Sequence, residues 1–233
     1  MTRRPFNGNY IMLIFLVIMV FNAIRSPQYG SIGEWLVATL LKLPAIVIGI
    51  TIHEHAHAWT AWKLGDRTPM AQGRVTLNPA KHIDPFGIIA LIFVGFGWGR
   101  PVQVNPYAFR KNRRLANLLV SVAGVATNLV AAFLCTALLF FVTNGVLSTV
   151  LYYIVWFNIV LMIFNLLPVP PLDGFGILTE IFDLRRASWY DTLYSFGSII
   201  LLLLIMTGAT GKILGPAVLS ISRAFISVWG LVL

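Results

Sequence analysis

Charged residues are scarce in this sequence. Only 11% of its 233 residues are Asp, Glu, Lys or Arg, whereas 58% are hydrophobic. A water-soluble domain normally has about a quarter of its residues charged, so we expect an all-α, multi-pass membrane protein. The single cysteine, Cys135, has no partner, which excludes a disulfide framework.

Acidic residues are the rarer of the two charge types. Eight Asp and Glu face 17 Lys and Arg, which gives a formal charge of +9. Nucleic-acid binding is one explanation of such a balance, but basic residues also collect in the cytoplasmic loops of membrane proteins. We therefore expect a lipid bilayer and no nucleic acid as partner.

Apolar stretches recur along the chain, and crossing a bilayer takes about 20 apolar residues. They are residues 10–24, 35–64, 115–142, 150–167, the shorter 192–207, and 213–233. The first could be part of a signal peptide, but no convincing cleavage site follows it. The last could span the membrane or lie along its surface. We expect five or six transmembrane helices in one domain, residues 1–233, with its core at about 35–180.

The segment between residues 64 and 114 is strongly basic. It contains Arg67, Arg74, Lys81, Arg100, Arg110, Lys111, Arg113 and Arg114 against only two aspartates, Asp66 and Asp84. The positive-inside rule predicts that residues 65–114 and the N-terminus are cytoplasmic, in the cell membrane. Within it, "GRVTLNPAKHIDP" predicts short strands and turns at the membrane surface. The apolar, Gly-rich residues 85–99 predict a membrane-dipping segment.

Three histidines and a glutamate lie in the apolar stretch "ITIHEHAHAW", residues 50–59. Residues four apart share a helix face, so His53 and His57 can bind one metal ion, with Glu54 as a general base. A lone histidine in an apolar helix is more often a core residue, but ionisable groups in a span need compensation. We interpret His55 and His82 as structural or supporting residues.

Catalytic zinc usually has three protein ligands and one open position. Most carboxylates of the chain lie near span ends or in loops: Glu34, Asp66, Asp84, Glu180, Asp183 and Asp191. Asp173 differs, because it follows an apolar span that Pro168, Pro170 and Pro171 must end. It is the best candidate third ligand; the alternative is a turn aspartate beside Gly174.

Four motifs together resemble the site-2 protease family of intramembrane zinc metalloproteases. They are "HEHAH" at 53–57, "GRVTLNPAKHIDPFG" at 73–87, "AGVATN" at 123–128 and "NLLPVPPLDG" at 165–174, in the family's order. Val125 departs from the Ala-Gly-Pro often found before the asparagine. No PDZ or CBS module is visible, so the chain resembles the small members of the family.

The resemblance implies one Zn²⁺ bound by His53, His57 and Asp173, with Glu54 as catalytic base. It implies that Asn165 helps to hold the substrate backbone or to orient the site, and that Asn128 is a polar site position; we assign both to substrate binding. The expected activity is hydrolysis of a peptide bond within or near a transmembrane segment of a membrane protein, as in regulated intramembrane proteolysis. The substrate is left open. A metal transporter and an inactive binding protein that keeps the fold are the alternatives.

Overall fold

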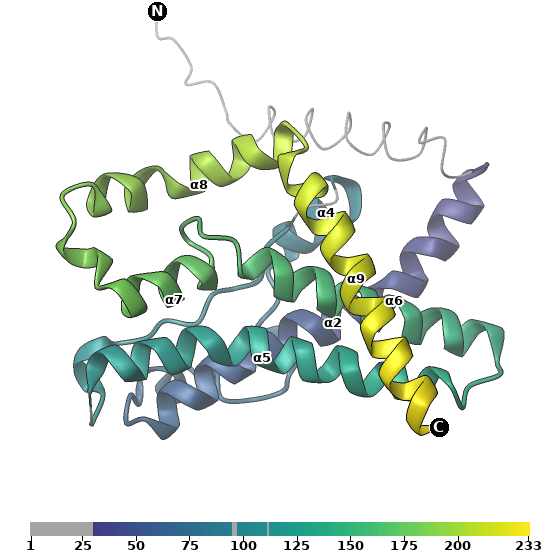
Figure 1. The fold of residues 1–233 in the computed structure, drawn as a ribbon, viewed down its shortest axis with the longest axis horizontal. Coiled ribbons are helices and arrows are strands. Elements are labelled where there is room, and N and C mark those ends of the chain that lie inside the picture. The colour runs from purple at the N-terminus through teal and green to yellow at the C-terminus, as the bar shows by residue number, and fades with distance from the viewer. Residues whose placement is uncertain (1–29, 95–96, 111) are drawn as a thin grey trace, which may run out of the picture. The chain divides into compact units, whose positions relative to one another are not determined.

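The computed structural model describes residues 30–94, 97–110 and 112–233, and these residues form helices joined by turns and loops (Figure 1). The all-α prediction is therefore confirmed. The helices are α2 (Ile32–Lys63), α3 (Thr68–Ala71), α4 (Pro85–Val94), α5 (Arg113–Leu139), α6 (Gly145–Asn165), α7 (Asp173–Phe182), α8 (Tyr190–Met206) and α9 (Ala209–Val232). Three 3₁₀ turns lie at Pro79–Lys81, Pro106–Ala108 and Leu184–Arg186.

Four of the described helices are long and apolar enough to cross a membrane: α2, α5, α6 and α9. They correspond to the predicted stretches 35–64, 115–142, 150–167 and 213–233. The stretch 192–207 becomes α8, an apolar helix of 17 residues. The predicted span at 10–24 lies outside the described residues, so the total of five or six spans stays a prediction.

The chain divides into two compact units, and the smaller one combines residues 1–40 with 84–98. In its described part, Trp35 of α2 stacks on Phe93 of α4, with ring centroids 5.4 Å apart. The Asp84 carboxylate accepts hydrogen bonds from the N–H groups of Phe86 and Gly87 at the start of α4. The apolar residues predicted to dip into the membrane thus include a capped helix; their depth stays a prediction.

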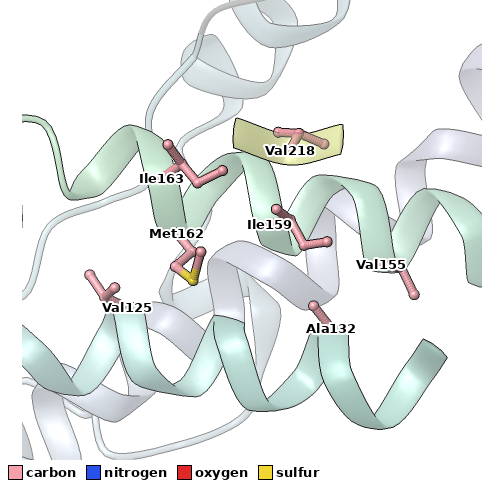
Figure 2. Close-up of a cluster of buried hydrophobic side chains, with 7 residues drawn as sticks. All are labelled: Val125, Ala132, Val155, Ile159, Met162, Ile163 and Val218. Carbon is pink, nitrogen blue, oxygen red and sulfur yellow. The ribbon is translucent and has the colours of Figure 1, made fainter. Parts of the chain in front are cut away.

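The larger unit, residues 41–83 with 99–233, contains the main core. Within it α5 packs against α6, α7 and α9, and α9 also packs against α6. Figure 2 shows a buried cluster in which side chains of α5, α6 and α9 meet. Its members are Val125 and Ala132 of α5, Val155, Ile159, Met162 and Ile163 of α6, and Val218 of α9.

Local signals in the sequence fix where these helices begin and end. The side chains of Asn112 and Asn144 accept hydrogen bonds from the first free N–H groups of α5 and α6. After α6 ends at Asn165, the proline-rich turn cannot continue a helix. The next helix, α7, starts at Asp173, and Gly174 packs so closely on the carbonyl of Leu166 that a side chain would not fit there. The turn therefore holds Asp173 near the end of α6.

The strands predicted between α2 and α5 are not found among the described residues, where the one strand-like pairing is an isolated bridge between Ile83 and Gly99. Side chains take the carbonyls that a ladder would use. The guanidinium of Arg74 donates to the carbonyls of Lys81 and Arg100, and His82 Nε2 lies 2.7 Å from the Thr76 carbonyl. This segment is therefore a set of turns held together by side chains.

Candidate metal centre

The two histidines of the H-E-x-x-H motif point the same way from α2. His53 and His57 are buried, and their Nε2 atoms lie 3.0 Å apart. One helical turn separates the two residues, so both rings lie on one face of the helix, as the spacing predicts. The pair thus offers two nitrogen ligands at one point.

Asp173, at the first position of α7, completes the group. Its Oδ2 atom lies 3.3 Å from Nε2 of His53 and 3.3 Å from Nε2 of His57. Among the described residues, one group of three or more His, Cys, Asp or Glu side chains lies within metal-binding distance, and it consists of His53, His57 and Asp173. The prediction that residues 120 positions apart in sequence meet at one site agrees with this geometry.

Helix α5 packs directly behind the two rings. The Val120 carbonyl lies 2.7 Å from His57 Nδ1, and the Asn128 Oδ1 atom lies 2.6 Å from His53 Nδ1. Midway between them, a Cβ on Gly124 would come within 2.5 Å of His57 Nε2 and 2.6 Å of His53 Cε1. Residues 120, 124 and 128 are spaced by four, so one stripe of α5 supports both histidines.

These contacts determine where the ring protons lie. A carbonyl oxygen only accepts hydrogen bonds, so His57 Nδ1 carries a proton, and in the neutral ring Nε2 then carries the lone pair. His53, facing the Asn128 oxygen, is protonated in the same way. Among the described residues no group donates a hydrogen bond to Asp173 Oδ2, although this atom is buried. With both rings neutral, three electron-rich atoms converge at one point, which is an arrangement that can hold a metal cation.

The donor set fits zinc. Zinc binds imidazole nitrogen at about 2.0–2.1 Å and carboxylate oxygen at about 2.0–2.2 Å in a tetrahedral arrangement, which places ligand atoms roughly 3.3–3.5 Å apart. The observed separations of 3.0, 3.3 and 3.3 Å are close to these values. Two histidines and one aspartate leave one of four positions open, as catalytic zinc sites do.

Glu54, next to His53 on α2, is held by a different part of the chain. Its Oε2 atom accepts a hydrogen bond of 3.1 Å from the N–H of Val102. The Arg74 guanidinium lies 4.0 Å from the same oxygen. Gly99 also lies close, since a Cβ there would be 3.5 Å from Glu54 Oε1. The carboxylate is thus oriented from outside the helices, with Oε1 left for other chemistry.

Burial lowers the pKa of both basic side chains near Glu54, but the two remain in different charge states. It lowers the pKa of Arg74, while the nearby Glu54 carboxylate opposes that change; an arginine nevertheless stays charged at neutral pH. Burial also lowers the pKa of His82. His82 is therefore neutral at pH 7 and donates from Nε2 to the Thr76 carbonyl. This assignment supports the structural role predicted for His82.

The two asparagines assigned to substrate binding lie in different surroundings. Asn165, the last residue of α6, bonds back to the Leu161 carbonyl with its Nδ2 atom. Asn128 is completely buried, and all its described contacts are internal. Sequence reasoning missed Asn158, a second fully buried asparagine that contacts Asn128. The available signal was an amide in an apolar span, which is a functional hypothesis by default.

This helical membrane protein has two histidines, an aspartate and an adjacent glutamate at one buried point. Such a set of residues is typical of a metallohydrolase. Comparison with protein families identifies which one. The model of peptidase family M50 matches residues 42–145 and 141–206. The chain belongs to this family, the site-2 proteases.

Curated relatives agree with this assignment. The chain is 41% identical over 196 residues to "Putative zinc metalloprotease YwhC" of Bacillus subtilis, covering 80% of this chain and 86% of that protein. It is 33% identical over 141 residues to "Putative zinc metalloprotease Rip2" of Mycobacterium tuberculosis, covering 57% of this chain and 53% of that protein. No solved structure matches the chain significantly. The predicted family is confirmed, and with it a membrane metalloprotease that uses zinc.

Proposed function

We propose that this protein is an intramembrane endopeptidase that cuts a membrane protein within or next to a transmembrane segment, in regulated intramembrane proteolysis. His53, His57 and Asp173 are its zinc ligands and Glu54 is its general base. The observation that carries the proposal is the convergence of two Nε2 atoms from the apolar helix α2 with one carboxylate oxygen from the start of α7. The whole chain, residues 1–233, forms the protease domain.

Bound zinc supplies Lewis acidity, which polarises a peptide carbonyl and makes water acidic enough to lose a proton near neutral pH. The chain supplies the rest. Glu54 Oε2 is occupied by the Val102 N–H, so Oε1 takes the proton from water. The same oxygen then delivers the proton to the leaving amine nitrogen, as a general base turned acid does.

A substrate helix has to unwind before it can be cut, because its peptide groups are paired internally. An unwound peptide commonly pairs with an extended segment. The strands predicted in residues 73–85 would have offered such a segment, but residues 99–105 fit better. They are not helical, contact Glu54 through the Val102 N–H and end at Asn105, whose backbone is extended. The N–H groups of Gln103 and Val104 have no partner among the described residues. Asn165 and Asn128 stay candidates for substrate contacts.

The orientation is part of the proposal: the N-terminus and residues 65–114 lie in the cytoplasm of a cell-membrane protein. A single cysteine at Arg67 in a Cys135→Ala background tests it. The thiol should react with a membrane-impermeant maleimide in inverted vesicles and not in intact cells. The opposite labelling pattern would reverse the topology.

The activity is tested with purified protein and a panel of single-span peptides, followed by mass spectrometry of the fragments. Cleavage should map within or beside the apolar segment, cease after chelation and return with zinc. Capture of a peptide without any product would instead indicate a binding protein.

Asp173→Asn tests the ligand assignment. Loss of an outer-shell partner of a zinc ligand typically costs about 10–100-fold in affinity, and loss of the charged ligand itself should cost more. Zinc retained after dialysis against a chelator gives the readout. Zinc content equal to wild type under that challenge would remove Asp173 from the ligand set.

A further inference from the structure

Two fully buried asparagines link three helices next to His53. Asn128 on α5 and Asn158 on α6 are both 0% exposed. Asn128 Nδ2 donates to Asn158 Oδ1 over 2.7 Å and to the carbonyl of Gly49 on α2 over 3.2 Å. Asn158 Nδ2 donates to the Ile154 carbonyl over 2.8 Å. With the 2.6 Å contact between Asn128 Oδ1 and His53 Nδ1, the amides form a continuous relay.

The direction of this relay is fixed by backbone carbonyls, which can only accept hydrogen bonds. Ile154 O requires the NH₂ group of Asn158, so Asn158 presents its oxygen to Asn128. That oxygen and Gly49 O both require the NH₂ group of Asn128, so Asn128 presents its oxygen to His53. His53 must then carry its proton on Nδ1. Reversing either amide would place oxygen against oxygen in a buried, apolar setting, where unpaired polar groups are costly.

We propose that Asn158 is a positioning residue for the metal centre, which acts through Asn128 to keep the lone pair of His53 on Nε2. The inference rests on the proposed function, in which His53 Nε2 binds zinc. Neither asparagine contacts the metal or the substrate in this role. His57 needs no such relay, because a backbone carbonyl, that of Val120, fixes its proton directly. The proton positions of His53 and His57, the two ligands from one motif, thus depend on different groups.

The relay makes a prediction that ordinary packing does not. Outer-shell partners of metal-bound histidine typically contribute about 10–100-fold to metal affinity. Asn128→Leu should fall in this range. Asn158→Leu should weaken zinc binding less, near the lower end, because the Gly49 carbonyl still orients Asn128 in part. Leucine matches asparagine in the number and branching of its side-chain heavy atoms and is larger, so no cavity is created.

The test measures the zinc dissociation constant of the purified, detergent-solubilised full chain by competition with a chromogenic chelator. Four variants are compared with wild type: Asn128→Leu, Asn158→Leu, the double variant and Asn117→Leu. Asn117 is the matched control, since it is a buried asparagine on α5 whose Nδ2 atom has no hydrogen-bond partner in the described part of the chain and which has no described contact with the relay. Its replacement should leave zinc affinity unchanged.

The double variant decides whether Asn158 acts through Asn128. If it does, the double variant and Asn128→Leu should differ in zinc dissociation constant by less than about 2-fold. Deviations of that size are usual even between independent sites, so a difference of about 2-fold counts as no further effect. Two full, independent losses that multiply in the double variant would overturn the relay. So would an Asn158→Leu variant that binds zinc as tightly as Asn117→Leu.

Two further measurements keep the result interpretable. The zinc-induced rise in melting temperature depends on affinity, so it should shrink in the relay variants even if the zinc-free protein is also less stable. If Asn158→Leu does not fold, Asn158→Ser removes the acceptor with a smaller change and should weaken zinc binding likewise. His53→Ala separates the two levels of the argument. If it retains full zinc affinity, the proposed function fails; if it loses zinc while Asn158→Leu does not, only the relay fails.

Discussion

The α5–α6 pair and the irregular segment between α2 and α5 hold two adjacent side chains of α2 in different ways. His53 is held from the helices by a buried, uncharged group, the amide of Asn128, which is itself hydrogen-bonded to Asn158. Glu54 is held from the irregular segment by the Val102 N–H and, at 4.0 Å, by the Arg74 guanidinium.

The two kinds of support suit two kinds of task. A metal ligand needs a fixed lone pair, and neutral hydrogen bonds inside a packed core supply a rigid orientation. A general base has to exchange protons with water and substrate, and the Glu54 side chain remains 15% exposed. The comparison teaches that metal binding and proton transfer should be separable by mutation, although the residues concerned are neighbours in sequence.

Glu54→Gln should have the largest effect on activity, because it removes the base that the irregular segment holds. Glutamine can still accept the Val102 N–H but cannot take a proton, and general bases contribute about 10²–10⁴-fold to rate. Peptide cleavage should fall by that factor while zinc content stays at the wild-type level. His57→Ala provides the contrast, because it should lose zinc and activity together. A Glu54→Gln protein that still cleaves would exclude Glu54 as the base.

Gly124→Ala should disturb the support that α5 gives to the two histidines. In a helix, replacing glycine by alanine normally stabilises by roughly 0.5–1 kcal/mol. Here the added methyl group would lie 2.5 Å from His57 Nε2 and 2.6 Å from His53 Cε1, so the rings must move apart. We expect a loss of zinc affinity at least as large as that of an outer-shell partner, about 10–100-fold, measured by chelator competition.

Gly215→Ala is the matched control for this change. Gly215 lies inside α9, and a Cβ there would meet no atom within 4 Å. This variant should keep its zinc and melt at the same or a slightly higher temperature. If both alanine variants behaved alike, the contact between α5 and the two rings would not be needed for metal binding.

The part of the site that follows from helix geometry could be predicted from sequence. The i, i+4 spacing puts His53 and His57 together, and three prolines after an apolar span mark where Asp173 emerges. The long apolar stretches likewise gave four described helices within a few residues of their bounds. Each of these features depends on local periodicity or on a residue that cannot continue a helix.

The rest depends on contacts between segments far apart in the chain. Asn158 resembles any polar residue in a span until α5 brings Asn128 to it, 30 positions away. The strands expected around residues 73–85 were inferred from alternation, which takes no account of competing side chains. Arg74 and His82 take carbonyls that a ladder would have used. Such tertiary competition leaves no periodic trace in the sequence.

Arg74→Met should have the smallest effect on activity of the changes considered. Arg74 is 5% exposed, and its guanidinium joins the carbonyls of Lys81 and Arg100 beside Glu54. Losing it should let the segment that carries Val102 shift, which loosens the orientation of Glu54. Small displacements near a reacting group can cost up to about 100-fold in rate; we expect about 10-fold here, because the Val102 hydrogen bond itself survives.

The measurement is peptide cleavage alongside zinc affinity, with two companions. Arg74→Lys keeps the charge but not the forked geometry, so it should recover only part of the rate. Arg67→Met removes an exposed arginine of the same segment and should change neither quantity. Zinc affinity should be unaffected in all three, because the histidines are oriented from α5. A zinc loss in Arg74→Met that matches its loss of rate would show that the irregular segment also supports the metal ligands, and the division between the two regions would fail.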